Sequence, residues 1–221
     1  MLSKQEAIRL ATAIHGWCTE VELEWLYDAA RCVPVGGTWV EVGCWKGRSL
    51  AAVAFGLPPM KYQDSLGGGR CELIPVDTFR GNTQSLTHFE VRFGDWVRGH
   101  VDLLGKLLKH ERPDIIVRPP AVMSAARFAW ERIDISIDAV HLDPDYRDSR
   151  DNPAGAHEAA VADIEAWLPK IKPGGLLCGR NCCDLFPGVR RAVEECLGSV
   201  SMIEVERPRD VPNYLWFWRK P

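Results

Sequence analysis

The chain has 221 residues, of which 46% are hydrophobic and 26% are charged, so its composition is that of a globular protein rather than a disordered or fibrous one. Its 30 acidic and 27 basic residues nearly balance, so the chain lacks the basic excess of a dedicated nucleic-acid-binding protein. This balance disfavours a nucleic-acid partner. No stretch reaches the ~20 apolar residues of a membrane span, so we expect no membrane partner and a cytoplasmic location.

Eight cysteines are scattered through apolar stretches without paired Cys-x-x-Cys spacing, and we expect them to be buried free thiols. Their one cluster is Cys178, Cys182 and Cys183. Adjacent cysteines do not easily serve one tetrahedral ion, so this cluster disfavours a zinc site.

Two helices are predicted before the first strand, at residues 4–15 and 19–32, because apolar residues recur there at helical spacing. Thr19 and Glu22 have the spacing of a capping box. We interpret residues 1–36 as an N-terminal helical cap.

From residue 38 onward, strand-like runs alternate with helical patterns. Strands are predicted at residues 38–43, 71–77, 114–119, 138–143 and 174–179. Helices are predicted at residues 47–56, 84–110, 124–131, 155–171 and 188–198. The last two strands, 200–207 and 213–220, are joined by a short turn and should pair antiparallel. The pattern predicts a single α/β domain over residues 1–221, a doubly wound sheet between two helical layers.

The first strand runs into a turn with a glycine at each end, "GCWKGRS", residues 43–49. In doubly wound sheets ligands bind beyond the carboxyl ends of the strands, so this turn is the predicted binding loop. A dinucleotide loop needs G-x-G-x-x-G, but Trp45 and Arg48 stand at the second and third glycine positions, which disfavours NAD. A phosphate loop would be one residue longer and carry lysine, so a P-loop nucleotide-binding protein is the distant alternative.

S-adenosylmethionine fits this turn better, because Glu41 just before it suits a ligand with an ammonium and a sulfonium group and would repel polyphosphate. Gly43 and Gly47 let the chain bend around the methionine part. The second strand ends in Asp77, where a carboxylate can grip the two hydroxyls of a ribose.

With these features the chain resembles the class I S-adenosylmethionine-dependent methyltransferases, and among them methyltransferase domain family 24. The resemblance rests on several motifs in the family's order, among them "TWVEVGCWKGRSLAAVA", "IPVDTFRGN", "AVHLDPDY", "AVADIEAWLPKIKPGGLLCG" and "FPGVRRAV". It implies a Rossmann-like fold of seven strands with a C-terminal antiparallel hairpin, and S-adenosyl-L-methionine as cofactor.

The family pattern also implies roles for individual residues. The residues expected to frame the methionine side of the cofactor are Glu41, Gly43, Cys44, Trp45, Gly47 and Ser49. The residues expected beside its adenosine are Asp77 at the ribose hydroxyls, Thr78, Phe79, and Met123 and Ser124 at the adenine edge. Asp143, which ends the strand "AVHLD", is expected to line the cofactor near its methyl group.

Methyl transfer is an in-line displacement in which the protein aligns the acceptor, and an oxygen or nitrogen acceptor must also lose a proton. We expect Asp143, Asp145 and Tyr146 to supply the catalytic groups. Relatives usually read Asp-Gly-Asp-His here, so in this chain a phenol with an unperturbed pKa near 10 replaces the histidine. The acceptor that we expect is the hydroxyl of a small molecule.

A second departure follows the next strand, where relatives commonly read Gly-His-Asp-Tyr and this chain reads Gly179-Arg180-Asn181-Cys182. The change removes the better ligands for a hard metal, although Asp143 with Asn181 could still hold Mg²⁺ weakly, so the metal requirement stays open. Two other functions also stay open. One is an amino-group methyltransferase, because "DPDY" is similar to the Asp-Pro-Pro-Tyr motif of enzymes that act on flipped DNA bases. The other is a catalytically impaired protein that binds the cofactor. Homo-oligomer formation is open as well.

Overall fold

The computed structural model describes residues 2–60, 69–79, 88–132, 136–144, 153–205 and 213–221, and of residues 88–96 and 132 it describes the backbone alone. Its strands are β1 (Thr38–Val42), β2 (Cys71–Asp77), β3 (Ile115–Val117), β4 (Ala121–Val122), β5 (Ile137–Leu142), β6 (Ile171–Gly179), β7 (Ser201–Val205) and β8 (Asn213–Arg219). Its helices are α1 (Lys4–Ala13), α2 (Glu20–Arg31), α3 (Arg48–Gly56), α4 (His88–Glu111), α5 (Ala125–Arg132), α6 (Pro153–Trp167) and α7 (Pro187–Leu197), with a 3₁₀ turn at Leu168–Lys170.

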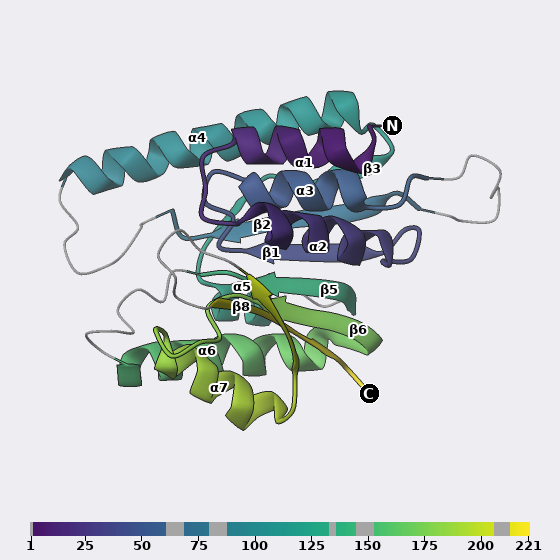
Figure 1. Cartoon of the computed structure of the whole chain (residues 1–221). Coiled ribbons are helices and arrows are strands. Elements are labelled where there is room, and N and C mark those ends of the chain that lie inside the picture. The colour runs from purple at the N-terminus through teal and green to yellow at the C-terminus, as the bar shows by residue number, and fades with distance from the viewer. Residues whose placement is uncertain (1, 61–68, 80–87, 133–135, 145–152, 206–212) are drawn as a thin grey trace.

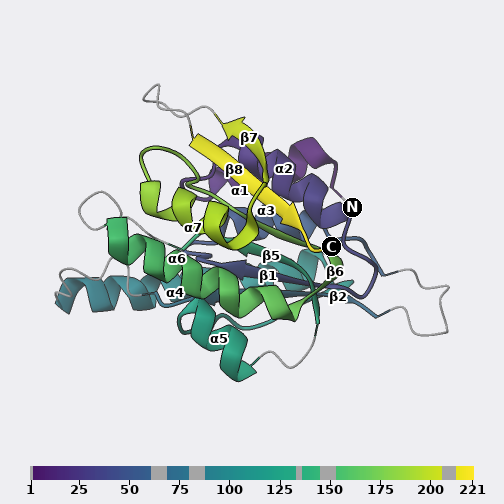
Figure 2. The same ribbon diagram turned by 90° about the horizontal axis from the view of Figure 1, so that it is seen from below.

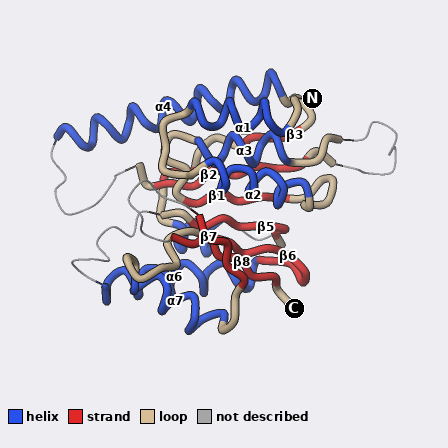
Figure 3. The backbone as a smooth tube through the Cα atoms, in the orientation of Figure 1, coloured by secondary structure: helices blue, strands red, loops and turns tan. Residues whose placement is uncertain are grey.

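The strands form one sheet in the order β3-β2-β1-β5-β6-β8-β7 (Figure 3). The short β4 pairs with β2 beside this path. The strands from β1 to β6 pair in parallel, and β8 pairs antiparallel with both β6 and β7. This confirms the predicted doubly wound sheet and its C-terminal hairpin. The strand order reverses between β1 and β5, so the carboxyl ends of these two strands form the crevice in which such folds bind ligands.

Helices cover both faces of the sheet. Apolar residues of α2, α3 and α4 pack on one face, and those of α5, α6 and α7 pack on the other (Figures 1 and 2). Helix α1 packs outside α2 and α3 through a smaller apolar cluster around Ala7, Ala11 and Leu23. None of the helices within the described ranges has the length and apolar content to cross a bilayer.

The N-terminal helices begin as their sequence predicts. Thr19 accepts a hydrogen bond from the backbone of Glu22, and Glu22 accepts one from the backbone of Thr19, so the capping box of α2 is formed. Ser3 and Glu6 form a second box at α1. These boxes satisfy amide groups that the first helical turn leaves without partners.

Three local details differ from the prediction. The helix predicted over 155–171 ends at Trp167, because Pro169 cannot continue the hydrogen-bond ladder, and residues 168–170 form the 3₁₀ turn. The sheet has an eighth strand, β4, whose two residues are too few to show a periodic pattern. Six of the eight free cysteines are buried as predicted, whereas Cys32 is exposed and Cys196 is half-buried.

Candidate functional site

The glycine turn, residues 43–47, follows β1 directly and depends on both of its glycines. Gly43 has φ 78°, and a Cβ added there would overlap the carbonyl group of Asp143 at the end of β5. Gly47, the N-cap of α3, has φ 89°, and a Cβ there would collide with the side chain of Leu104. Glycine is therefore required both for the left-handed backbone and for the close approach of the two strand ends.

Asp77 holds the glycine turn from the neighbouring strand. The amide of Trp45 donates to its Oδ2 atom at 2.9 Å, and the amide of Phe79 donates to Oδ1 at 2.7 Å. Trp45 (φ 41°) and Phe79 (φ 52°) both have left-handed backbones. Each carboxylate oxygen can accept a further hydrogen bond, so Asp77 keeps the capacity to bind a ribose hydroxyl while it shapes the turn.

Glu41, Gly47 and three further residues among those predicted to line the cofactor are buried. Cys44, Ser49 and Phe79 are 2%, 5% and 8% exposed, and Cys44 and Phe79 pack in the core beneath the turn. Burial raises the pKa of the Cys44 thiol well above its usual value, so this side chain is not a thiolate. These residues can meet a ligand mainly through their backbone.

Glu41 is fully buried, and both of its oxygens are engaged inside the protein. The indole Nε1 of Trp39 donates to Oε2 at 3.1 Å, and Nδ1 of His141 lies 2.9 Å from Oε1. Burial alone would lower the pKa of His141, but the charge and hydrogen bond of Glu41 outweigh burial and raise that pKa above its usual value. The pair thus places a fully buried, hydrogen-bonded carboxylate at the end of β1, just before the turn.

The segment predicted to meet the adenine lies beside Asp77. Strand β4 pairs with the end of β2, with Val122 opposite Asp77, so Met123 and Ser124 follow at the same edge of the sheet. Met123 is half-buried, Ser124 is exposed, and the Ser124 carbonyl accepts the amide of Phe128 in the first turn of α5. Thr78, next to Asp77, is half-buried.

Asp143 follows β5 across the crevice from the glycine turn, and its side chain is 16% exposed. Its Oδ2 atom accepts a hydrogen bond of 2.7 Å from Nη1 of Arg180. Burial raises the pKa of this carboxyl group although Arg180 and His141 act in the opposite direction. The other two predicted catalytic residues, Asp145 and Tyr146, lie outside the described residues.

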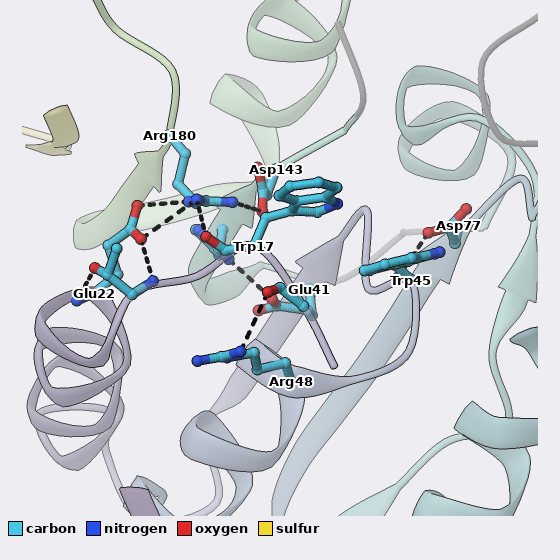
Figure 4. A network of polar contacts seen from close by, with 11 residues as sticks. Trp17, Glu22, Glu41, Trp45, Arg48, Asp77, Asp143 and Arg180 are labelled. Atoms are coloured by element: carbon cyan, nitrogen blue, oxygen red, sulfur yellow. Dashed lines mark hydrogen bonds and ion pairs between the residues drawn. The ribbon is translucent and has the colours of Figure 1, made fainter. Parts of the chain in front are cut away.

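Arg180, which follows β6, joins Asp143 to the N-terminal helices (Figure 4). Its Nε donates to Oε1 of Glu22 at 2.6 Å, and its Nη2 donates to the carbonyl oxygen of Trp17 at 2.9 Å. Arg180 is 3% exposed and Glu22 is fully buried. The residue was singled out in the sequence as a departure from relatives, but its partners could not be foreseen, because Glu22 precedes it by 158 positions.

A second arginine holds the same N-terminal segment, residues 14–17. Nη1 of Arg48, the first residue of α3, donates to the carbonyl oxygen of Gly16 at 3.2 Å. Trp17 is 61% exposed and stacks on Trp45 of the glycine turn, with ring centroids 6.3 Å apart and an interplanar angle of 18°. Contacts with Arg180, Arg48 and Trp45 therefore hold the segment between α1 and α2 at the carboxyl edge of the sheet, next to Asp143.

The described residues do not fit a divalent metal at this place. They contain no group of three or more His, Cys, Asp or Glu side chains able to hold an ion. The sequence allows Asp143 and Asn181 as weak Mg²⁺ ligands. In the structure, the guanidinium of Arg180 already donates a hydrogen bond to one oxygen of Asp143. Asn181 follows with a left-handed backbone, φ 65°.

Comparison with known proteins places the chain in a family. The family model described as a methyltransferase domain matches residues 40–182, which run from β1 through the end of β6 and include the glycine turn, Asp77, Asp143 and Arg180. The chain belongs to this methyltransferase family. No match was found among curated protein sequences.

Solved structures show where the fold of this methyltransferase recurs. An O-methyltransferase from Bacillus cereus in complex with SAH is 15% identical, with 98% of this chain and 90% of that chain covered and a TM-score of 0.54. The O-methyltransferase TomG from Streptomyces achromogenes, in complex with SAM, is 17% identical, with the same coverage and a TM-score of 0.59. An rRNA methylase from Streptococcus thermophilus is 11% identical, with 93% and 99% covered and a TM-score of 0.50.

Proposed function

We propose that this methyltransferase transfers a methyl group from S-adenosylmethionine to the hydroxyl of a small molecule. The observation that carries the proposal is the position of Asp143, a partly exposed carboxylate whose carbonyl group touches Gly43 and whose Oδ2 is held by Arg180. The similar folds of two O-methyltransferases, in complex with SAH and SAM, support it.

The described residues fit this cofactor on the adenosine side. Asp77 would bind the ribose hydroxyls, and Met123 and Ser124, which follow its register partner Val122, would border the adenine. Gly43 allows the backbone of Asp143 to approach the glycine turn, because a Cβ at this position would overlap the Asp143 carbonyl group. The bound cofactor supplies a methyl group made electrophilic by a sulfonium.

The charges around the crevice suit a cationic ligand. Glu22 and Asp143 each contribute a negative charge against the one positive charge of Arg180, so this cluster of three residues is net negative, while Lys46 and Arg48 add positive charge at the glycine turn. Glu41 lies below the turn, paired with His141. In a buried setting such charges act more strongly than in water, so the cluster favours a sulfonium over a neutral group.

Asp143 is also placed to accept the proton that a hydroxyl must lose. Arg180 engages Oδ2, and Oδ1 is the oxygen that we expect to meet the acceptor. Because the guanidinium fixes the carboxylate, the geometry for proton removal is set before the acceptor arrives. Asp145 and Tyr146 remain predicted contributors, and the cytoplasmic location stays a prediction.

Ribosomal RNA is the second candidate acceptor, since the fold is shared with an rRNA methylase. The formal net charge of −3 argues against it, because RNA-binding surfaces need basic residues. An amine is the third acceptor to consider.

The test is transfer of a labelled methyl group from S-adenosylmethionine to a phenol, a catechol, an alkyl alcohol, an amine and ribosomal RNA, with Asp143→Asn in parallel. We expect labelling of a hydroxyl compound and at least tenfold slower transfer by the variant. Labelling of only the amine or the RNA would replace the proposed acceptor, and cofactor binding without labelling of any acceptor would support the catalytically impaired alternative.

A further inference from the structure

We propose that Arg180 is the resident cation of the acceptor site, takes the place that a divalent metal would occupy on Asp143, and makes Glu22 and the N-terminal helices part of that site. The inference concerns the same site as the proposed function and deepens it. Its first test does not depend on that function being correct.

The contacts of the guanidinium support a fixed cation rather than a flexible surface charge. Arg180 donates through Nη1 to Asp143, through Nε to Glu22 and through Nη2 to the carbonyl oxygen of Trp17, at 2.7, 2.6 and 2.9 Å. A planar guanidinium with five donors suits such simultaneous contacts, and it stays charged at any relevant pH. With 3% exposure, the side chain has no freedom to leave Asp143 without breaking a buried network.

A divalent ion and Arg180 cannot easily share Asp143. An ion on the carboxylate would lie next to the guanidinium, and the two positive charges would repel each other in a poorly solvated place. The second carboxylate, Glu22, is bound to Arg180 by a second contact from Nη2 at 3.3 Å. The two carboxylates that could neutralise a metal are therefore already neutralised in large part by one guanidinium.

The anchoring of Arg180 couples the N-terminal cap to the reaction centre. Glu22 is the third residue of α2 and forms its capping box with Thr19, so its position is set by the start of that helix. Trp17 contributes its backbone to Arg180 and its exposed ring to the stack on Trp45. Glu22 is thus a positioning residue, which acts on Asp143 through Arg180.

The first test titrates MnCl₂ and MgCl₂ by calorimetry into the protein saturated with S-adenosylhomocysteine. We expect that neither ion binds at a 1:1 site that includes Asp143. Any binding that remains in Asp143→Asn lies elsewhere and agrees with the proposal. Stoichiometric Mn²⁺ binding that Asp143→Asn abolishes would overturn it. This test stands even if no acceptor is ever methylated, in which case the proposed function fails and this inference is still decided.

The second test uses the acceptor found in the methyl-transfer assay. We expect turnover to be unaffected by EDTA, to fall at least tenfold in kcat in Arg180→Gln, and to recover in part in Arg180→Lys, which keeps the charge. Without the guanidinium the pKa of Asp143 rises further, so the acidic limb of the kcat profile should move to higher pH in Arg180→Gln. Glu22→Gln removes a negative charge that raises this pKa, so it should move the limb to lower pH. Loss of turnover in EDTA, or an unmoved acidic limb, would contradict the proposal.

Arg112 offers a matched control for these variants. It is also 3% exposed and binds a carboxylate, Asp114, together with the carbonyl oxygens of Ala54 and Leu57, but it precedes β3 at the opposite edge of the strands. Arg112→Gln should destabilise the fold comparably and leave the pH profile where it is. If it shifts the profile as Arg180→Gln does, the effect is structural and the inference falls.

Discussion

Replacing Gly43 by alanine tests the close approach of β1 and β5, on which the site depends. The substitution forces a residue with a Cβ into a φ of 78°, which costs about 1–2 kcal/mol. The new Cβ would also lie 2.5 Å from the carbonyl carbon of Asp143 and 2.8 Å from the nitrogen of Pro144. Both neighbours are backbone atoms that cannot rotate away, so overpacking adds a further ~1–3 kcal/mol.

Gly174→Ala is the matched control, because Gly174 has φ 76° and a Cβ there meets nothing within 4 Å. The strain and the entropy lost by the unfolded chain are nearly the same for both variants and cancel in the comparison. We therefore expect Gly43→Ala to lower the free energy of unfolding in urea by about 1–3 kcal/mol more than Gly174→Ala does. Calorimetry should show cofactor affinity reduced at least tenfold in Gly43→Ala alone. Equal losses of stability, with cofactor binding intact, would refute the reasoning.

Three further predictions follow from the buried charges and from the exposed indole. Glu22→Gln leaves Arg180 without one of its two carboxylates and should lower the free energy of unfolding by ~3 kcal/mol in urea, whereas a change below ~0.5 kcal/mol would mean that the pair is not formed. The pKa of His141 is raised in the folded protein, so its contribution to stability is complete below the unfolded pKa near 6.5 and is lost as the pH rises through the folded pKa. The urea midpoint of the wild type should therefore fall as the pH is raised through this range, and the midpoint of His141→Gln should fall less. Trp17→Ala keeps the carbonyl that binds Arg180, so thermal unfolding should change little while KM for a small-molecule acceptor rises, and an unchanged KM would exclude the ring from the acceptor site.

The doubly wound sheet and its C-terminal hairpin were predictable because alternating strand and helix patterns leave few topologies for a parallel sheet. Sequence patterns also located the capping box of α2, since its hydrogen bonds join residues three positions apart. Strand β4 was missed because two residues carry no period, and its place beside β2 comes from long-range pairing.

The site was predictable as a set of positions but not as a set of contacts. The strand ends located Asp77 and Asp143, because carboxyl ends of parallel strands meet at one edge. The burial of Glu41 with His141 depends on the register of β1 against β5, and the contact of Arg180 with Glu22 depends on how α2 lies over the sheet. Neither contact is encoded in local spacing. In the sequence, Arg180 therefore stood out only because it replaces one of the metal ligands expected at this position.

The central claim is that the glycine turn and Asp77 form an S-adenosylmethionine site, and calorimetric titration with S-adenosylmethionine, S-adenosylhomocysteine, ATP and NAD tests it most directly. The account predicts binding of the two adenosyl ligands alone, weakened at least tenfold by Asp77→Ala because charge-assisted hydrogen bonds contribute about 1.5–3 kcal/mol. Asp184→Ala, a change at a side chain that is 94% exposed, should leave the affinity unaltered. Binding of ATP or NAD without binding of S-adenosylmethionine would contradict the account.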